Sequence, residues 1–167
     1  MTGPSPVFEG VGGYFKAVTR KPFGLAAMGG RRHPFKILEC SIKRFPLGQY
    51  SQIARVKGAS ELVFIAGQLA SDKAGNIVGA DDFDAQCAQV FANMEAALKA
   101  VGGGWGNVVQ FTTYLVHSQD VPKFRAFRQR EFPRFFPNAV YPPNTLVMVD
   151  RLVGEPYLVE IQTVAAL

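Results

Sequence analysis

The sequence predicts a single α+β domain in which two helices pack on one face of a mixed β-sheet. Two segments place apolar residues every three or four positions, a spacing that is typical of amphipathic helices. Short runs of β-branched and aromatic residues stand before, between and after these segments, and such runs favour strands. The predicted order is β-β-α-β-α-β-β, and a chain of 167 residues with 48% hydrophobic content is long enough to bury one core.

The first 44 residues differ from the rest and are predicted to form a basic, irregular N-terminal extension. They are rich in glycine and proline, and their aromatic residues follow neither a helical nor a strand period. A basic, acid-poor segment is also typical of a transit peptide, but its prolines and glycines disfavour an amphipathic targeting helix. An upstream translation start is an equally good explanation. We therefore place the folded domain at residues 45–167.

The charge of the chain is concentrated in this extension. Residues 1–44 hold eight basic and two acidic residues, whereas residues 45–167 hold ten basic and eleven acidic ones, so the net charge of +5 does not belong to the domain. A nucleic-acid-binding domain is usually basic, and nucleic acid is therefore disfavoured as a partner. No apolar run approaches the roughly 20 residues of a membrane-spanning helix, so we expect no membrane partner.

The cysteines indicate neither a disulfide framework nor a metal site. Cys40 and Cys87 are the only two, neither has a metal-like spacing, and the two histidines are distant from each other. Cys87 falls on the apolar face of a predicted helix, which favours a buried thiol in a reducing compartment. We therefore expect a cytoplasmic protein without a bound metal.

The predicted domain begins with two short strands. These are Ile53–Val56 and residues 62–66, separated by Lys57-Gly58-Ala59-Ser60, which has the composition of a hairpin-like connection. A turn cluster follows at residues 72–76.

The first predicted helix is capped by Asp81 or Asp82. Its apolar positions recur in steps of three and four, and Gly102-Gly103-Gly104 ends it. A third strand is predicted at residues 108–116 from its β-branched and aromatic content. The helix's apolar positions are Phe83, Cys87, Val90, Phe91, Met94, Leu98 and Val101.

The second predicted helix opens at Asp120-Val121-Pro122, where a missing proline N–H is least costly. Phe124 and Phe127 share one face with Glu131 near its edge, and Pro133 is expected to end or kink the helix. The arginines at 125, 128 and 130 spread around the other faces, which predicts a solvated helix surface.

The last two predicted strands carry the most informative polar residues. Asn144 stands at the entrance of one apolar run, and Glu160 lies inside the other. Polar groups in such runs need partners where they are buried, so these two residues are the first candidates for a functional site. The helices cover one face of the sheet only, and oligomerisation is the natural way to cover the other.

Ordered motifs within residues 47–166 resemble those of the Rid family, the reactive intermediate deaminases, which is also called the YjgF family. The resemblance implies a chorismate-mutase-like subunit that assembles as a homotrimer with ligand pockets between subunits. Its deaminase members hydrolyse enamines and imines, such as 2-aminoacrylate, to keto acids and ammonia without a metal or an organic cofactor. The motifs are Gly48-Gln49-Tyr50-Ser51-Gln52, Leu62–Gln68, residues 75–79 and 107–114, Tyr141-Pro142-Pro143-Asn144 and residues 158–161.

Three positions match the family pattern and therefore receive roles from the resemblance. Glu160 and Tyr50 are the candidate catalytic residues: the carboxylate orients water or transfers a proton, and the phenol donates a hydrogen bond. Burial between apolar neighbours is expected to raise the pKa of Glu160. The backbone N–H groups near Gly67 are candidates for binding an anion or a carbonyl group. The alternative for Glu160 is an edge-strand carboxylate paired with an arginine. The alternative for Tyr50 is an aromatic residue that only packs.

Three other positions depart from the deaminase pattern. Asn144 stands where the family has the arginine that binds the substrate carboxylate, Ala66 replaces a serine, and Leu146 replaces a threonine or cysteine. An amide cannot supply the two charge-assisted hydrogen bonds of a guanidinium. The alternative interpretation of Asn144 is a turn residue at the entrance of the strand that binds no ligand. Arg125 is a candidate replacement for the missing cation if its side chain reaches a neighbouring pocket.

These observations favour a cofactor-independent hydrolase or deaminase that acts on an imine, an enamine or a related small carbonyl compound. Its substrate range is expected to differ from that of the arginine-bearing deaminases. A non-catalytic trimer that binds a small ligand or another protein is the alternative. Endoribonuclease activity, which is attached to some relatives, is the third hypothesis, and the charge of −1 on residues 45–167 counts against it.

Overall fold

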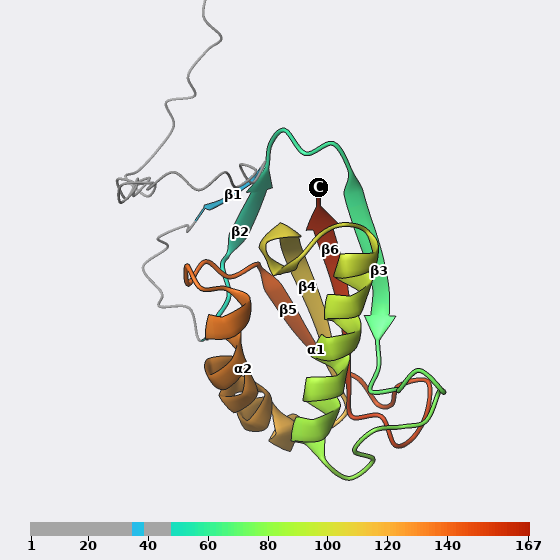
Figure 1. The fold of residues 1–167 in the computed structure, drawn as a ribbon. Helices are drawn as coiled ribbons and strands as arrows, with labels where there is room; N and C mark the ends of the chain where they lie inside the picture. Colours follow the sequence, from blue (N-terminus) through green and yellow to red (C-terminus); the bar gives the residue numbers. More distant parts are fainter. Residues whose placement is uncertain (1–34, 39–47) are drawn as a thin grey trace, which may run out of the picture.

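The computed structural model describes residues 35–38 and 48–167 (Figure 1). The two longer helices, α1 and α2, lie side by side over one face of a four-stranded sheet, while a separate two-stranded sheet contacts the larger sheet through β2 and β4. The elements in order are β1 (Phe35–Leu38), β2 (Ile53–Val56), β3 (Leu62–Gln68), α1 (Phe83–Ala100), η1 (Trp105–Asn107), β4 (Val108–Leu115), η2 (Ser118–Asp120), α2 (Val121–Phe135), β5 (Asn144–Met148) and β6 (Val159–Ala166).

The four-stranded sheet has the order β3-β6-β4-β5. β6 is antiparallel to both of its neighbours, β3 and β4, whereas β5 runs parallel to β4 at the edge. The sheet is therefore mixed, and the predicted α+β class with two helices on one face is confirmed. The last strand of the chain occupies a central position, so its side chains are held from both sides.

The predicted hairpin between residues 53–56 and 62–66 is wrong. β2 pairs antiparallel with β1, and β3 pairs with β6 in the other sheet. The backbone N–H groups of Ser60 and Glu61 both donate to the carbonyl of Leu167, at 2.6 and 3.2 Å, which holds the connection against the end of β6. β1 lies inside the segment predicted to be irregular, and the remainder of residues 1–44 is outside the described residues.

The first helix begins and ends as its sequence predicts. The side chain of Asp82 accepts hydrogen bonds from the backbone N–H groups of Asp84 and Ala85, at 3.0 and 3.1 Å, and so caps α1. After Ala100 the chain turns at Gly102, whose φ of +74° lies in the left-handed region that favours glycine.

The second helix does not end at Pro133 but continues to Phe135. The proline ring of Pro133 removes a single backbone N–H donor, and buried aromatic residues hold the helix on both sides of this position. Phe132 is 1% exposed, Phe135 is also buried, and the N–H of Phe136 donates to the carbonyl of Phe132 at 2.7 Å. Burial of these rings outweighs the lost hydrogen bond.

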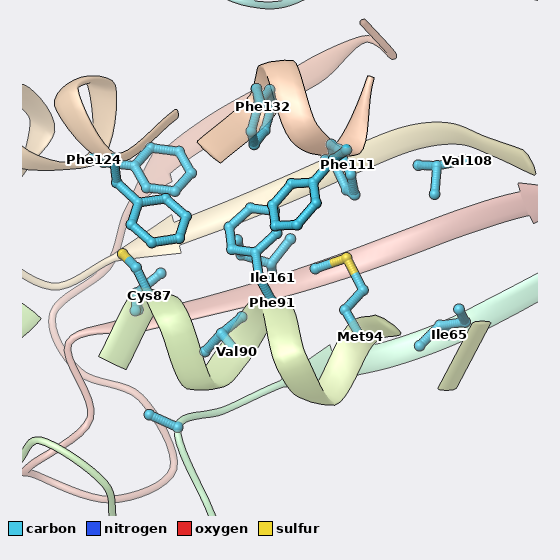
Figure 2. Packing of buried hydrophobic residues seen from close by; sticks show 14 of the residues in the cluster. Ile65, Cys87, Val90, Phe91, Met94, Val108, Phe111, Phe124, Phe132 and Ile161 are labelled. Carbon is cyan, nitrogen blue, oxygen red and sulfur yellow. The ribbon is translucent and has the colours of Figure 1, made fainter. Parts of the chain in front are cut away.

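The core is an aromatic cluster between the helices and the sheet (Figure 2). The ring of Phe91 projects from α1 toward Phe132 of α2 and Phe111 of β4, with centroid separations of 5.6 and 6.3 Å. Cys87 lies on the same helix and is buried, as predicted. Burial raises the pKa of its thiol, so this side chain behaves as an apolar core residue.

No helix in the described part of the chain is long and apolar enough to cross a membrane. The sheet face opposite the helices carries exposed apolar side chains on its β3 edge: Leu62 is 55% exposed and Phe64 is 76% exposed. We refer to this face, with Phe64 and Glu160 on it, as the open face.

Removing two methyl groups from the helix–sheet interface is expected to destabilise the fold. Val90 is fully buried, so Val90→Ala is predicted to lower the free energy of unfolding by about 2 kcal/mol through lost apolar burial and a residual cavity. Val153→Ala is the matched control, since Val153 is 84% exposed, and it should change stability little. Urea unfolding at one fixed protein concentration measures both. Equal effects of the two variants would contradict this assignment of the core.

Candidate functional site

Glu160 lies on the open face, in the middle of the sheet. It belongs to β6, opposite Tyr114 of β4, and its neighbours Val159 and Ile161 point into the core. Together with Gly67 and Arg151, Glu160 and Tyr114 line a hollow of about 330 Å³ on this face. A strand position between two buried residues thus fixes the direction in which the carboxylate points.

Gly67 makes the space that the carboxylate occupies. β3 has an irregular register between Ile65 and Gln68, and this bulge brings the backbone of Gly67 against the Glu160 side chain. A Cβ atom on Gly67 would lie 1.7 Å from Oε1 of Glu160. Any larger residue at position 67 therefore has to displace the carboxylate. Ala66, the preceding residue, is exposed.

The electrostatics of Glu160 suit proton transfer. Burial raises the pKa of Glu160 above the ordinary range of a glutamate. The ion pairs of the described residues do not include Glu160, and Arg151 of the same hollow is 3.6 Å from Glu155 instead. Within the described residues, Glu160 therefore has no arginine partner of the kind that the sequence left open as an alternative. A carboxyl group that binds a proton more readily than usual can give and take protons closer to neutral pH.

Tyr50 lies away from the open face, beside the entrance of β5. The next residue, Ser51, forms a bridge with Pro143, and its hydroxyl donates to the carbonyl of Tyr141. These contacts hold the segment around Tyr50 against the chain that leads into β5. The two candidate catalytic residues, Tyr50 and Glu160, are therefore not brought together within one chain.

Asn144 and Leu146 face the helices, on the side of the sheet opposite Glu160. The amide oxygen of Asn144 accepts a hydrogen bond of 2.8 Å from the hydroxyl of Thr113, which is 1% exposed. Leu146 packs against the hydrophobic core. Asn144 is thus neither a simple turn residue nor a neighbour of the Glu160 carboxylate.

Arg128 contradicts the predicted solvated surface of the second helix, since it is only 6% exposed. Its guanidinium lies over the rings of Phe132 and Phe124, with its central carbon 4.5 and 5.6 Å from their centroids. Burial lowers its pKa to about 10, while the hydroxyls of Tyr50 and Tyr141 act in the opposite direction.

A helical spacing that the sequence analysis overlooked would have placed Arg128 correctly. Phe124, Arg128 and Phe132 follow one another at intervals of four, which puts the arginine between two buried phenylalanines on one helix face. Arg125 is exposed, as predicted, and within the described residues it forms no ion pair. Its reach into a neighbouring pocket stays a prediction.

Comparison with known proteins gives one consistent result. A family model described as Endoribonuclease L-PSP matches residues 41–167. A RutC family protein from Synechocystis is 34% identical over 133 residues, which cover 79% of this chain and 96% of that protein. The crystal structure of the Rid family protein YyfB from Yersinia pestis is similar with a TM-score of 0.70 and 28% identity, covering 81% of this chain and 100% of that one. RidA from a Psychrobacter species gives a TM-score of 0.54 at 30% identity, covering 74% and 92%.

The raised pKa of Glu160 predicts a specific dependence of stability on pH. The folded state favours the protonated form, so this contribution to stability is present below the unfolded-state pKa and is lost as the pH rises through the folded-state pKa. Glu160→Gln should therefore stabilise the fold more at about pH 7 than at about pH 4. Urea unfolding at both pH values measures the difference, with Glu61→Gln, an exposed carboxylate, as the control. A gain for Glu160→Gln that is larger at acid pH would contradict the assignment.

Proposed function

Because the chain belongs to the Rid/YjgF/RutC family, which includes enamine and imine deaminases, we propose that it hydrolyses a small enamine, imine or related carbonyl compound. The observation that carries this proposal is the unpaired Glu160 carboxylate in the hollow beside Gly67, with a pKa raised by burial. No metal or organic cofactor takes part in the proposed reaction.

The reaction is a hydrolysis in which water supplies the oxygen. An enamine such as 2-aminoacrylate first takes a proton on carbon and becomes an iminium ion. Water then adds to the carbon of the C=N bond while a base accepts its proton. The nitrogen is then protonated, and the C–N bond breaks as the new hydroxyl group gives its proton back to the base, so the products are a keto acid and ammonia. Proton donation and proton acceptance alternate along this sequence, so one carboxyl group that alternates between its two states can serve it.

In this proposal Glu160 is the catalytic acid–base group. It lies near the start of β6, between two buried neighbours, and the absence of a side chain on Gly67 leaves room for the carboxylate. The backbone N–H groups near Gly67 bind the anionic or carbonyl end of the substrate. Tyr50 donates a hydrogen bond from the other side of the pocket.

We propose that the pocket is shared between subunits of a homotrimer. Glu160 and Gly67 lie on the open face, whereas Asn144 and Tyr50 lie at the other side of the sheet or beyond its edge, so each chain supplies two separate halves. The exposed Phe64 supports the same arrangement, because a large apolar side chain on an open sheet is expected to be covered by a partner. In a closed ring of subunits, each interface brings the open face of one chain next to the Asn144 and Tyr50 region of its neighbour.

The substrate range is proposed to differ from that of deaminases with an arginine at the position of Asn144. The amide is already engaged with Thr113, and it carries no charge for a carboxylate. Ala66 and Leu146 add no polar groups to the binding surface. Arg125 remains the sequence's candidate for a cation contributed by a neighbouring chain.

The direct test is the release of ammonia or keto acid from freshly generated 2-aminoacrylate. Glu160→Gln is expected to lower the rate by about 10²- to 10⁴-fold, because general acid–base catalysis is lost. Gly67→Ala should lower it as well, since its Cβ displaces the carboxylate. Gly104→Ala is the matched control, because a Cβ at that position meets nothing within 4 Å, and it should keep the wild-type rate.

Two results of this assay would contradict the proposal. A Glu160→Gln protein with the wild-type rate would favour the alternative of a trimer that only binds a ligand or another protein. A wild-type rate equal to that of an arginine-bearing deaminase would contradict the role given to Asn144.

The trimer makes a separate prediction about the open face. Phe64→Glu places a charge on a side chain that is 76% exposed in one chain, so folding should survive while assembly is lost. Light scattering after gel filtration is expected to give three chain masses for the wild type and one for the variant. Val101→Glu, at the end of α1, is the control and should remain trimeric. A wild-type monomer would rule out a pocket shared between subunits.

A further inference from the structure

Arg128 carries two hydrogen-bond donors that nothing in the structure satisfies. Its Nε and Nη2 atoms are both buried and have no hydrogen-bond partner among residues 35–38 and 48–167. Buried polar groups of side chains are almost always paired. The two donors also belong to the same edge of the guanidinium, where their N–H bonds point in nearly the same direction. This edge is the one that binds both oxygens of a carboxylate in a fork-like pair.

The charge on this side chain is equally uncompensated. A pKa of about 10 leaves the guanidinium protonated at neutral pH. The ion pairs of the described residues include Arg130 and Arg134 on the same helix but not Arg128. The phenylalanine rings on either side stabilise the cation through their faces. They leave its donor edge without an acceptor, and a buried unpaired cation is costly.

The surroundings of Arg128 connect it to Tyr50 and to the segment that leads into Asn144. The rings of Tyr141 and Phe132 pack with centroids 5.9 Å apart, and Tyr141 leads through two prolines into Asn144. Tyr50, the candidate hydrogen-bond donor, acts to raise the pKa of the same guanidinium. Both tyrosines are partly exposed.

We propose that Arg128 binds the carboxylate of the substrate through its Nε and Nη2 edge, in place of the cation that Asn144 does not supply. The carboxylate enters past the rings of Tyr50 and Tyr141 and replaces the missing acceptor. This inference deepens the proposed function and rests on it for placing the reaction next to Arg128. It assigns to Arg128 the cation that the sequence analysis sought at Arg125.

Binding of a matched pair of probes tests the proposal without turnover. Pyruvate carries a carboxylate, and pyruvamide is its neutral analogue. Calorimetric titration of the full-length wild type should show that pyruvate binds more tightly than pyruvamide. Arg128→Met should weaken pyruvate binding roughly 10- to 100-fold, the effect of losing a charge-assisted pair, and should leave pyruvamide binding unchanged.

Two further variants separate binding from structure. Arg134→Met is the matched control, because Arg134 also lies over a phenylalanine ring, 4.9 Å from its centroid, yet is exposed and paired with Glu131. It should keep the full preference for pyruvate. Arg128→Lys retains the charge but cannot form the two parallel hydrogen bonds of a guanidinium, so it should fold and retain part of the preference for pyruvate. This variant decides the question if Arg128→Met does not fold.

The outcomes also distinguish this inference from the proposed function. A wild type without preference for pyruvate, or an Arg128→Met or Arg128→Lys protein with the full preference, would overturn the role of Arg128 even if enamine hydrolysis occurs. A preference that depends on Arg128 in a protein without hydrolytic activity would support the carboxylate site and contradict the proposed reaction.

Discussion

The alternation of side chains along β6 is the constraint on which the rest of this structure depends. Val159 and Ile161 are almost completely buried under the helices, so the pleat of the strand forces Glu160 to the opposite face. Neighbouring strands on both sides keep this register fixed. The aromatic core therefore does more than stabilise the fold: it sets the direction of the carboxylate and leaves it without an ion pair in a partly buried position.

The same sheet divides the polar residues of the chain into two groups. Glu160 and Gly67 lie on the open face, while Arg128 and Tyr50 lie on the helix side near the entrance of β5. In our proposal, a single chain therefore holds a proton-transfer group and an anion-binding group that do not meet. Association through the open face brings the two groups together in our proposal, so assembly and chemistry depend on one surface.

The sequence was sufficient for features that depend on neighbours in the chain. The cap at Asp82 and the apolar stripe of α1 follow from local spacing, and both are confirmed except at Val101, which lies beyond the end of the helix and is 40% exposed. The pairing of β2 with β1 was missed because strand partners are chosen by contacts far apart in sequence. The charge of Arg128 favours a surface position, but its spacing of four residues from each of two buried phenylalanines places it on the buried face of the helix. The raised pKa of Glu160 was expected from its apolar neighbours, whereas its separation from Tyr50 required the fold.

The central claim is that the reaction needs groups from two chains. Glu160→Gln and Arg128→Met chains, each expected to be impaired alone at substrate concentrations well below saturation, can be unfolded together and refolded as mixed assemblies. If one site is formed at each interface of a closed ring, random mixing restores about one quarter of the intact sites, and deaminase activity should return to about that fraction of the wild type. Mixed assemblies as inactive as the separate variants would contradict the account, because both groups would then have to act from the same chain.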